Sequence, residues 1–567
     1  LHLIYHSKLI AMDRREFLSA TRARKNMPVA STPRGRTFSG LNPYNGAWTS
    51  NEVTHLLKRT MFGATKADID YFLGKSMTAA VDELLNSVAA FPPPPLKDYD
   101  TTGAVAPDSN IAPGTTWVND SSTDGTVNSG RKSSLKKWWI GVMLNQDRSI
   151  REKMLLFWHN HFSTQTEIVA NAALYYKHLN LLRSNCLGNF KSLTRGVTID
   201  PNMLDYLNGQ YNTKGAPDEN YARELQELFT LGKENNPNYT EADVQTAARV
   251  LTGWRIDIAT LNAFFDATKH DTDDKTFSSF YGNTNVTGRS GPTAGDQELD
   301  DFLNMIFSKD IEVSNFIVRK IYRWFVYYEI DAAAEANVIE PLALIFRNNN
   351  WEIKPVLDAL FKSEHFFDVL NQACIIKSPA DYVVGLCREF QVQFPGASDI
   401  VKQYGMWGYL ANWGATMQQD IGDPPSVSGW TASTQIPMFH EIWINNDTYP
   451  KRNQFSDTLI YTGYTRNGST IIIDPVSFTK TLSNPGDPNM LITDALSILY
   501  RISFSQSAKD QVKTDILLSG QTNDYYWTNA WNSYIASPTD MMAYQAVYTR
   551  LRDMYKYFMN LAEYHLS

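Results

Sequence analysis

Two histidines separated by one asparagine are the residues of this chain most suggestive of chemistry. They lie in FWHNHFST, residues 157–164, as His159, Asn160 and His161. Imidazoles act as general bases and metal ligands, and the amide between them can donate and accept hydrogen bonds. The run before them has helical spacing, and helical residues two apart point about 200° from each other. The rings are therefore not expected to form a joint metal clamp, and at most one of them faces a polar centre.

A second group of candidates lies in ENYARELQELFTLG, residues 219–232. Arg223 can hold an anionic group, and Glu224 can act as an acid, a base or the carboxylate partner of a histidine. Together with His159, Asn160 and His161 they form our candidate catalytic set. Each group also has a structural interpretation. The His-Asn-His triplet can tie loops to a helix end, and the Arg-Glu pair can belong to an ion network on a helix surface.

Candidate metal ligands occur in DATKHDTDDKT, residues 266–276. His270, Asp271 and Asp273 offer one imidazole and hard carboxylate oxygens, which suit calcium or, with a further histidine, a transition metal. The segment lacks the glycine and glutamate of an EF-hand loop. The cofactor is unknown from the sequence; a divalent metal is one interpretation and a solvated acidic loop is the other.

Motifs of several other chemistries are absent from the sequence. It contains no P-loop, no G-x-G-x-x-G, no G-x-S-x-G and no H-E-x-x-H. No motif therefore supports nucleotide binding, serine-hydrolase chemistry or zincin chemistry. The stretch DPPSVSGW, residues 423–430, predicts a rigid turn closed by a core tryptophan, Trp430. A Trp430 that stacks on a sugar ring is the alternative.

The elements that must position these residues are helices, and we predict a mainly α protein. Apolar residues recur at helical spacing, Thr65 and Thr240 are expected N-caps, and Gly232 is an expected stop. Extended segments are few, with 470–475 and 261–270 as candidates. The helices are predicted at 51–63, from 65, 134–145, 151–162, 220–232, 239–254, 312–328, 335–348, 354–364, 378–392 and 539–565.

Length and composition set the domain organisation. The 567 residues, with long Pro/Gly/Ser-rich stretches, predict one large helical domain with long irregular loops and a few short strands. The expected divisions are a basic arm at 1–45, a helical domain at 46–455 with loops at 91–130 and 271–297, and a C-terminal helical extension at 456–567 packed on it.

Charge and cysteines exclude several classes of protein. Net charge is −8, and residues 1–36 hold eight basic and two acidic residues, so the arm is +6 and the remainder −14. An acidic body argues against nucleic-acid binding. Three cysteines without a C-x-x-C pair indicate neither a disulfide framework nor a cysteine zinc site. No apolar run reaches the roughly 20 residues of a transmembrane helix.

The N-terminal stretch MDRREFLSA, residues 12–20, bears on location. Residues 13–18 are similar to a twin-arginine export motif, but a polar, basic segment follows where an export signal has an apolar one. The export route and the true start, Leu1 or Met12, stay open. We expect an extracytoplasmic protein.

Several stretches in a fixed order resemble the bacterial "domain of unknown function 1800" family. They span roughly residues 50–455, and the C-terminal hundred residues match less clearly. The matching stretches are HLLKRTMFGAT (55–65), REKMLLFWHNHFST (151–164), ENYARELQELFTLG (219–232), YTEADVQTAARVLTGW (239–254), FFDATKHDTDDKT (264–276), IIKSPADYVVGLCREF (375–390), DPPSVSGW (423–430) and WINNDTYPKRNQF (443–455).

The resemblance implies a mostly helical, often exported bacterial protein, commonly encoded beside a sulfatase-like partner, with no assigned reaction. Two functions follow as expectations. The first is a cell-envelope or secreted enzyme, or enzyme subunit, with a His/Asn/Arg/Glu polar centre. The second is a non-catalytic binding or assembly protein for the sulfatase-like partner or an envelope polymer. Convergence of the candidate side chains in one pocket favours the first.

Overall fold

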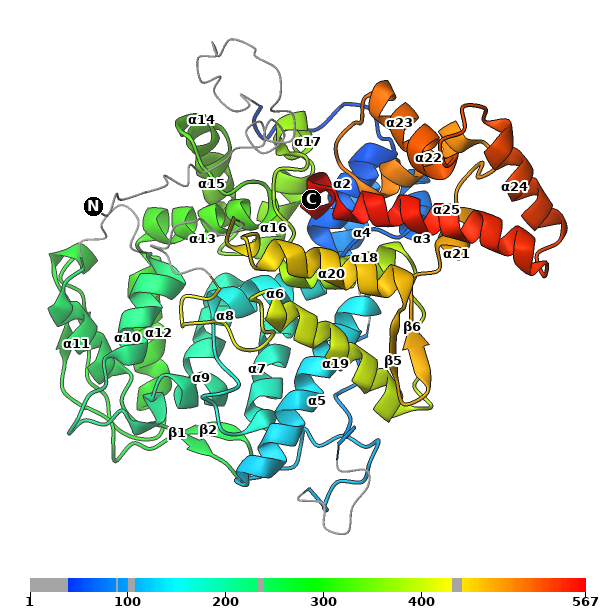
Figure 1. Cartoon of the computed structure of the whole chain (residues 1–567). Helices are drawn as coiled ribbons and strands as arrows, with labels where there is room; N and C mark the ends of the chain where they lie inside the picture. The colour runs from blue at the N-terminus through cyan, green and yellow to red at the C-terminus, as the bar shows by residue number, and fades with distance from the viewer. Residues whose placement is uncertain (1–38, 88–89, 100–107, 233–238, 431–440) are drawn as a thin grey trace, which may run out of the picture.

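Helices packed on helices make up the chain in the computed structural model, which describes residues 39–87, 90–99, 108–232, 239–430 and 441–567 (Figure 1). The mainly α class is confirmed, since 57% of the chain is helical and the strands are few and short. None of the described helices is long and apolar enough to cross a membrane. Residues 1–38 of the expected basic arm, with the twin-arginine-like motif, lie outside the described residues.

The helices of the first half begin where capping residues predict. Thr65 accepts a hydrogen bond from the Asp68 backbone, and Thr240 forms a full capping box with Asp243. Gly232, with φ +78°, ends the segment that begins with α10 and continues as a π-helical stretch over Leu225–Thr230. These helices are α2 Ser50–Thr60, α3 Lys66–Leu73, α4 Met77–Asn86, α5 Gly125–Leu144, α6 Arg151–His161, α7 Ala172–Ser184, α8 Phe190–Thr198, α9 Pro201–Tyr206, α10 Asn220–Glu224 and α11 Glu241–Val250.

The second half is also helical, and the helices predicted near 312–328, 335–348, 354–364, 378–392 and 539–565 are present. Two further π-helical turns, Glu335–Ile339 and Lys513–Leu517, extend neighbouring helices. The helices are α12 Ala294–Phe307, α13 Asp310–Phe325, α14 Ala332–Ala334, α15 Glu340–Asn348, α16 Ile353–Phe361, α17 Glu364–Phe367, α18 Pro379–Glu389, α19 Ile400–Thr416, α20 Thr448–Tyr461, α21 Pro475–Lys480, α22 Pro488–Leu499, α23 Gln506–Val512, α24 Tyr525–Ala536 and α25 Met541–Asn560.

The described strands form three antiparallel hairpins: β1 Trp254–Asp257 with β2 Asn262–Phe265, β3 Lys275–Thr276 with β4 Asn285–Val286, and β5 Tyr464–Arg466 with β6 Ser469–Ile471. Both predicted extended segments therefore contribute a strand. Both predicted loops are wrong at their C-terminal ends. Residues 91–130 include the start of α5, because Asp124 caps it by accepting from the Thr126 and Val127 backbones. Residues 271–297 include β3, β4 and the start of α12.

Helix α6 is buried almost all round, which is the mark of a central helix. Its first turn carries Glu152 and Lys153, both only 4% exposed. Buried charges of this kind require partners in the fold. The helix therefore determines where several charged groups of the molecule must meet.

The C-terminal helices pack on the rest through α20 and α25, which lie side by side (Figure 1). Ile376 pairs with Leu566 in an isolated β-bridge, so the last residues are tied to the segment before α18. The expected boundary between residues 455 and 456 falls inside α20. The division into domains stays a prediction.

Candidate functional site

The two histidines of FWHNHFST are both buried and contact different parts of the molecule. His159 Nε2 lies 2.6 Å from the Tyr175 hydroxyl, which donates to the Gly422 carbonyl oxygen at 2.8 Å. Since that hydroxyl has one proton, the imidazole N–H donates to Tyr175. Burial, with a smaller contribution from His178, lowers the pKa of His159 to about 3, so the ring is neutral.

His161 is held in the same way by other partners. Its Nε2–H donates to the Phe229 carbonyl oxygen at 3.1 Å, and its Nδ1 accepts from the Lys320 ammonium at 3.1 Å. Burial, and next the charge of Lys320, lower the pKa of His161 well below its usual range. The imidazole is therefore also neutral, and both of its nitrogens have protein partners.

Asn160 fastens the DPPSVSGW turn to the end of α6. Its side-chain oxygen accepts from the Trp430 backbone at 2.9 Å. Gly429 has φ +90°, and a Cβ there would lie 2.5 Å from the Asn160 carbonyl oxygen, so only glycine fits. The described contacts of the triplet tie other segments to the helix end. Trp430 is 4% exposed and packs near the His159 ring, as a core tryptophan does.

Arg223 lies in an ion network between α10 and the first turn of α11. It binds Glu241 through both terminal nitrogens, with Nη1 at 2.8 Å, and Glu219 at 3.0 Å. Hydrogen bonding to Glu241 raises the pKa of its guanidinium. Glu224 is the last residue of α10. This arrangement is a partly exposed helix-surface network.

Two of the candidate metal ligands, His270 and Asp271, are engaged by other groups of the protein. His270 Nδ1–H donates to the Thr252 carbonyl oxygen at 2.9 Å, and its Nε2 lies 3.1 Å from Glu298 Oε1. The Asp271 carboxylate accepts two hydrogen bonds from Arg249, at 2.7 and 3.1 Å, and one from the Asp273 backbone N–H at 2.9 Å. Asp273 is exposed. Within the described ranges no three His, Cys, Asp or Glu side chains are grouped to hold a metal ion.

The candidate groups do not converge in the part of the chain that the structure describes. His159 and His161 have no contact with Arg223, His270 or Asp271, and each of these side chains has partners of its own. The polar centre that would favour an enzyme is not assembled from them there.

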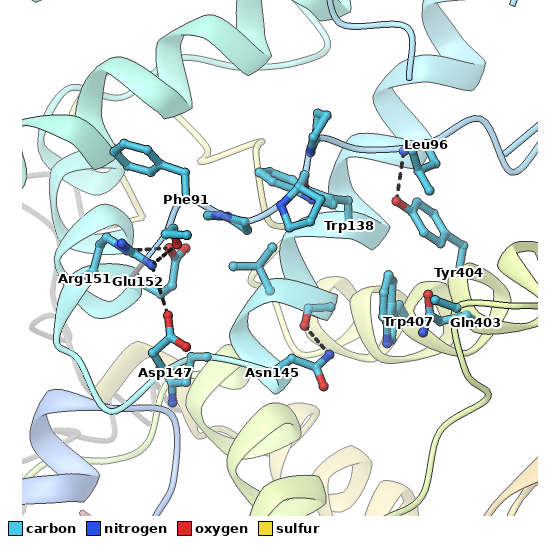
Figure 2. A pocket seen from close by; sticks show the side chains of 18 of the residues that line it. Phe91, Leu96, Trp138, Asn145, Asp147, Arg151, Glu152, Gln403, Tyr404 and Trp407 are labelled. Atoms are coloured by element: carbon cyan, nitrogen blue, oxygen red, sulfur yellow. Dashed lines mark hydrogen bonds and ion pairs between the residues drawn. The ribbon is translucent and has the colours of Figure 1, made fainter. Parts of the chain in front are cut away.

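The structure instead contains a cavity of about 450 Å³ between α5 and α19, the aromatic cavity (Figure 2). Its lining is mainly apolar, with polar groups gathered toward the start of α6. Figure 2 shows Arg151, Glu152 and Asp147 at one end and Tyr404, Trp407 and Gln403 at the other. The lining residues are Ala90, Phe91, Pro92, Pro93, Pro94, Leu96, Trp138, Gly141, Val142, Asn145, Gln146, Asp147, Ser149, Arg151, Glu152, Ala397, Ile400, Gln403, Tyr404 and Trp407.

A proline-rich strap, residues 90–96, runs across the aromatic cavity and is anchored along its length (Figure 2). Arg151 donates to the Ala90 carbonyl oxygen at 3.0 Å, and the Trp138 indole N–H donates to that of Pro93 at 2.7 Å. The Leu96 backbone N–H donates to the Tyr404 hydroxyl at 2.9 Å. Consecutive prolines restrict the backbone, so the strap is stiff before any ligand arrives.

The polar end of the aromatic cavity is built from paired charges. Arg151 binds Asp147 at 3.3 Å, and Glu152 receives two hydrogen bonds from Arg183, at 2.8 and 3.0 Å. Arg183 also lies over the Trp138 ring at 5.1 Å. These contacts fix the carboxylate and the tryptophan in one geometry.

Two polar groups of the wall have hydrogen-bonding capacity left. The Gln146 amide nitrogen and oxygen, and the Trp407 indole nitrogen, are buried and have no hydrogen-bond partner among the described residues. Buried polar atoms without a partner cost free energy, and a ligand that bonds to them removes that cost. Both residues are part of the cavity lining.

The sequence patterns that contain the cavity residues predict other features, a histidine site and a loop. Arg151 and Glu152 begin the stretch that contains the histidines, and FPPPP, residues 91–95, begins the loop predicted at 91–130. A proline run beside the tryptophan-rich helix SLKKWWIGVMLN was the available signal, since aromatic rings commonly pack on proline-rich segments. The fold of both segments onto α19 depends on contacts more than 250 residues apart, as between Gly141 and Trp407 or Leu96 and Tyr404.

Comparison with known proteins agrees with the resemblance in the sequence. The family model described as "Protein of unknown function (DUF1800)" matches residues 55–563, which extends the resemblance from residue 455 to nearly the C-terminal end. Neither the curated proteins nor the solved structures gave a match. With a match over almost its whole length, this chain belongs to the DUF1800 family.

Proposed function

We propose that this protein is a binding protein whose aromatic cavity takes a small amphipathic molecule with an apolar, ring-sized body and a hydrogen-bonding end. The observation that carries the proposal is the cavity itself, of about 450 Å³, with a mainly apolar wall and unpartnered polar atoms. Concave apolar sites with a few convergent polar groups are the usual form of small-molecule sites.

The apolar body of the ligand follows from the wall. Trp138 and Tyr404 are held by hydrogen bonds to the strap, and Trp407 packs against Gly141. Rings fixed in this way present their surfaces without losing side-chain entropy on binding. A flat or ring-shaped apolar group fits such a wall.

The hydrogen-bonding end follows from the groups near the start of α6. Gln146 offers two donors and an acceptor, and Asn145 lies beside it with a side chain bonded to Gly141. Arg151 and Glu152 are already paired, so the site as a whole is close to neutral. A ligand with hydroxyl or amide groups suits this end better than one with a high net charge.

Among the two expected functions, these observations support the binding protein. His159, His161 and Arg223 are engaged in contacts within the protein, whereas the aromatic cavity offers free surface. We extend the proposal to a ligand of the cell envelope or its surroundings, with a sulfatase-like protein as partner; this extension is supported by the family resemblance. Cell fractionation that recovers the protein only from the cytosol would contradict the location.

The test is a binding titration with 1-anilinonaphthalene-8-sulfonate, a fluorescent probe with fused apolar rings and a polar end. Val142→Trp fills the aromatic cavity, and Leu344→Trp places the same ring at a half-exposed position on α15. We expect saturable binding by the native protein and by Leu344→Trp. In Val142→Trp we expect affinity to fall at least about tenfold, which is roughly 1.4 kcal/mol.

Equal affinity of Val142→Trp and the native protein would overturn the proposal. Circular dichroism of both variants establishes that they are folded before they are compared. Mass spectrometry of small molecules released from the purified native protein then identifies the natural ligand.

A further inference from the structure

Six lysine and arginine side chains are buried together where α2, α6, α18 and α20 meet the C-terminal residues. Each is at most 5% exposed. Most of them come from stretches that carried the family resemblance, which lie far apart in the sequence. They are Lys58, Arg59, Lys153, Lys377, Arg452 and Arg501.

The carboxylates near these cations are fewer. Glu389 lies 2.6 Å from the Lys58 ammonium and is 1% exposed. Asp381 pairs with Lys153, and Glu52 contributes electrostatically at Arg501. Three side-chain carboxylates among the described residues thus lie near six side-chain cations. A buried excess of positive charge is costly unless another anion offsets it.

A small cavity of about 20 Å³ lies within this cluster, and we name it the cationic cavity. It has room for about one water-sized particle. Lys58, Arg59 and Lys153 all line it, together with Asp381 and Ser378. Ser567 lines it too, and Figure 1 shows the C-terminal end of the chain close to α2.

Arg59 is the side chain of the cationic cavity with donors to spare. It is 3% exposed, and its Nη2 donates to the Asn371 carbonyl oxygen at 3.0 Å and to Cys374 Sγ at 3.3 Å. Its Nε and Nη1 have no hydrogen-bond partner among the described residues. Arg59 thus lines a water-sized space and carries three N–H groups, on Nε and Nη1, without a partner among the described residues. A buried guanidinium of this kind is a donor that anion sites use.

We propose that the cationic cavity binds a compact inorganic anion of chloride size, held by Arg59 together with Lys58 and Lys153. The ion accepts hydrogen bonds from the free guanidinium N–H groups and offsets the charge of the two ammonium groups. It is a site separate from the aromatic cavity, and its ligand is of a different class.

The electrostatics of the cluster agree with this geometry. Burial lowers the pKa of Lys58 to about 7 and also lowers the pKa values of Arg59 and Lys153. These shifts mean that burial disfavours the charged forms of the three cations. An anion reverses that preference, so binding the ion and keeping the cations protonated go together.

The first experiment uses the native protein. Crystals soaked in bromide are examined for anomalous scattering, and we expect a bromide ion in the cationic cavity within hydrogen-bonding distance of Arg59. In solution, replacing gluconate by chloride at constant ionic strength and pH is expected to raise the melting temperature by at least about 2 °C and to saturate.

The second experiment compares two variants. Arg59→Lys keeps the charge but removes the free Nε and Nη1, and we expect it to lose most of the chloride response. Arg452→Lys changes a cation of the same cluster that does not line the cavity, and we expect it to keep the response. Each variant is compared with itself in the two salts. A general loss of stability therefore does not change the difference in melting temperature between chloride and gluconate.

Absence of bromide from the cationic cavity, together with equal melting temperatures in chloride and gluconate, would overturn the proposal. A chloride response of Arg59→Lys as large as that of the native protein would also overturn it. If the variants fail to fold, the bromide position in the native protein decides. Whether the native protein binds the probe tests the aromatic cavity alone, and whether bromide lies beside Arg59 tests the cationic cavity alone, so the two proposals can fail separately.

Discussion

At the scale of the residue, burial decides what each polar group can do. His159 is fully buried beside a tyrosine hydroxyl, and its imidazole has lost nearly all basicity. Lys58 is equally buried beside a carboxylate, and its ammonium titrates near neutral pH. The same physical cause makes one group inert and the other sensitive to its surroundings.

His159 is expected to make the fold sensitive to acid. Its folded pKa is about 3, against about 6.5 when unfolded, so the unfolded chain binds the extra proton. Stability from this group is therefore present above about pH 6.5 and is lost as pH falls toward 3. His159→Gln should reduce the slope of unfolding free energy between pH 6 and 4 by up to about 1.4 kcal/mol per pH unit.

Tyr175→Phe is the matched control, because it removes the hydroxyl that accepts from His159 but keeps the imidazole. It should lower stability at every pH and leave the slope almost unchanged. Denaturant unfolding at several pH values measures both quantities. An unchanged slope in His159→Gln would show that the ring is already charged in the fold.

Trp138 is expected to connect the strap to binding. Its indole N–H donates to Pro93 and is the hydrogen bond that fixes the middle of the strap. Trp138→Phe should cost about 1 kcal/mol of stability and weaken probe binding, because the strap is less well ordered. Fluorescence titration and thermal unfolding measure the two effects. Full probe affinity in a variant that has lost stability would mean that the strap has no part in the site.

At the scale of the element, close helix packing sets the shape of the aromatic cavity. Helix α5 lies against α19, and Gly141 of α5 packs closely under the Trp407 ring of α19. A Cβ at Gly141 would lie 2.6 Å from the Trp407 ring, which leaves no room for it. The cavity wall thus depends on one residue without a side chain.

Gly141→Ala is expected to push α5 and α19 apart. Overpacking of this kind costs roughly 1–3 kcal/mol, and the displaced Trp407 should weaken probe binding. Gly125→Ala lies on the same helix with no atom within 4 Å of the added Cβ, so it should be neutral or slightly stabilising. Thermal unfolding of both variants measures the difference. Equal stability would contradict this account of the packing.

Several elements were predictable from local signals, and the cavity was not. Thr240 and Asp243 form the capping box that fixes the start of α11, and Gly232 ends its segment at positive φ. Such signals involve neighbours in the sequence. The strap and the cationic cavity depend on pairs such as Leu96 with Tyr404, which no local pattern connects. The residue types of His159 and His161 suggest chemistry, whereas their burial depends on tertiary packing that the sequence pattern does not show.

At the scale of the whole molecule, the C-terminal helices complete structures that begin in the N-terminal half. Lys58 donates to the Leu499 carbonyl oxygen, and Arg501 donates to Asn51. A chain that ends at residue 455 would lack Leu499 and Arg501, so the buried Lys58 would lose its carbonyl acceptor while keeping Glu389, and α20 would be cut. We expect that truncated chain to be aggregated or unfolded by circular dichroism. A soluble, cooperatively unfolding product would show instead that the extension is an independent domain.

Helix α6 contributes neighbouring residues to both cavities and can therefore couple binding at one to binding at the other. Arg151 and Glu152 line the aromatic cavity, and the next residue, Lys153, lines the cationic cavity. A displacement of α6 as a rigid body moves all three side chains together. Occupancy of one site should therefore change the affinity of the other, reciprocally and by the same factor. Probe titrations in chloride and in gluconate measure that factor. A value of one would mean that the two sites are not coupled.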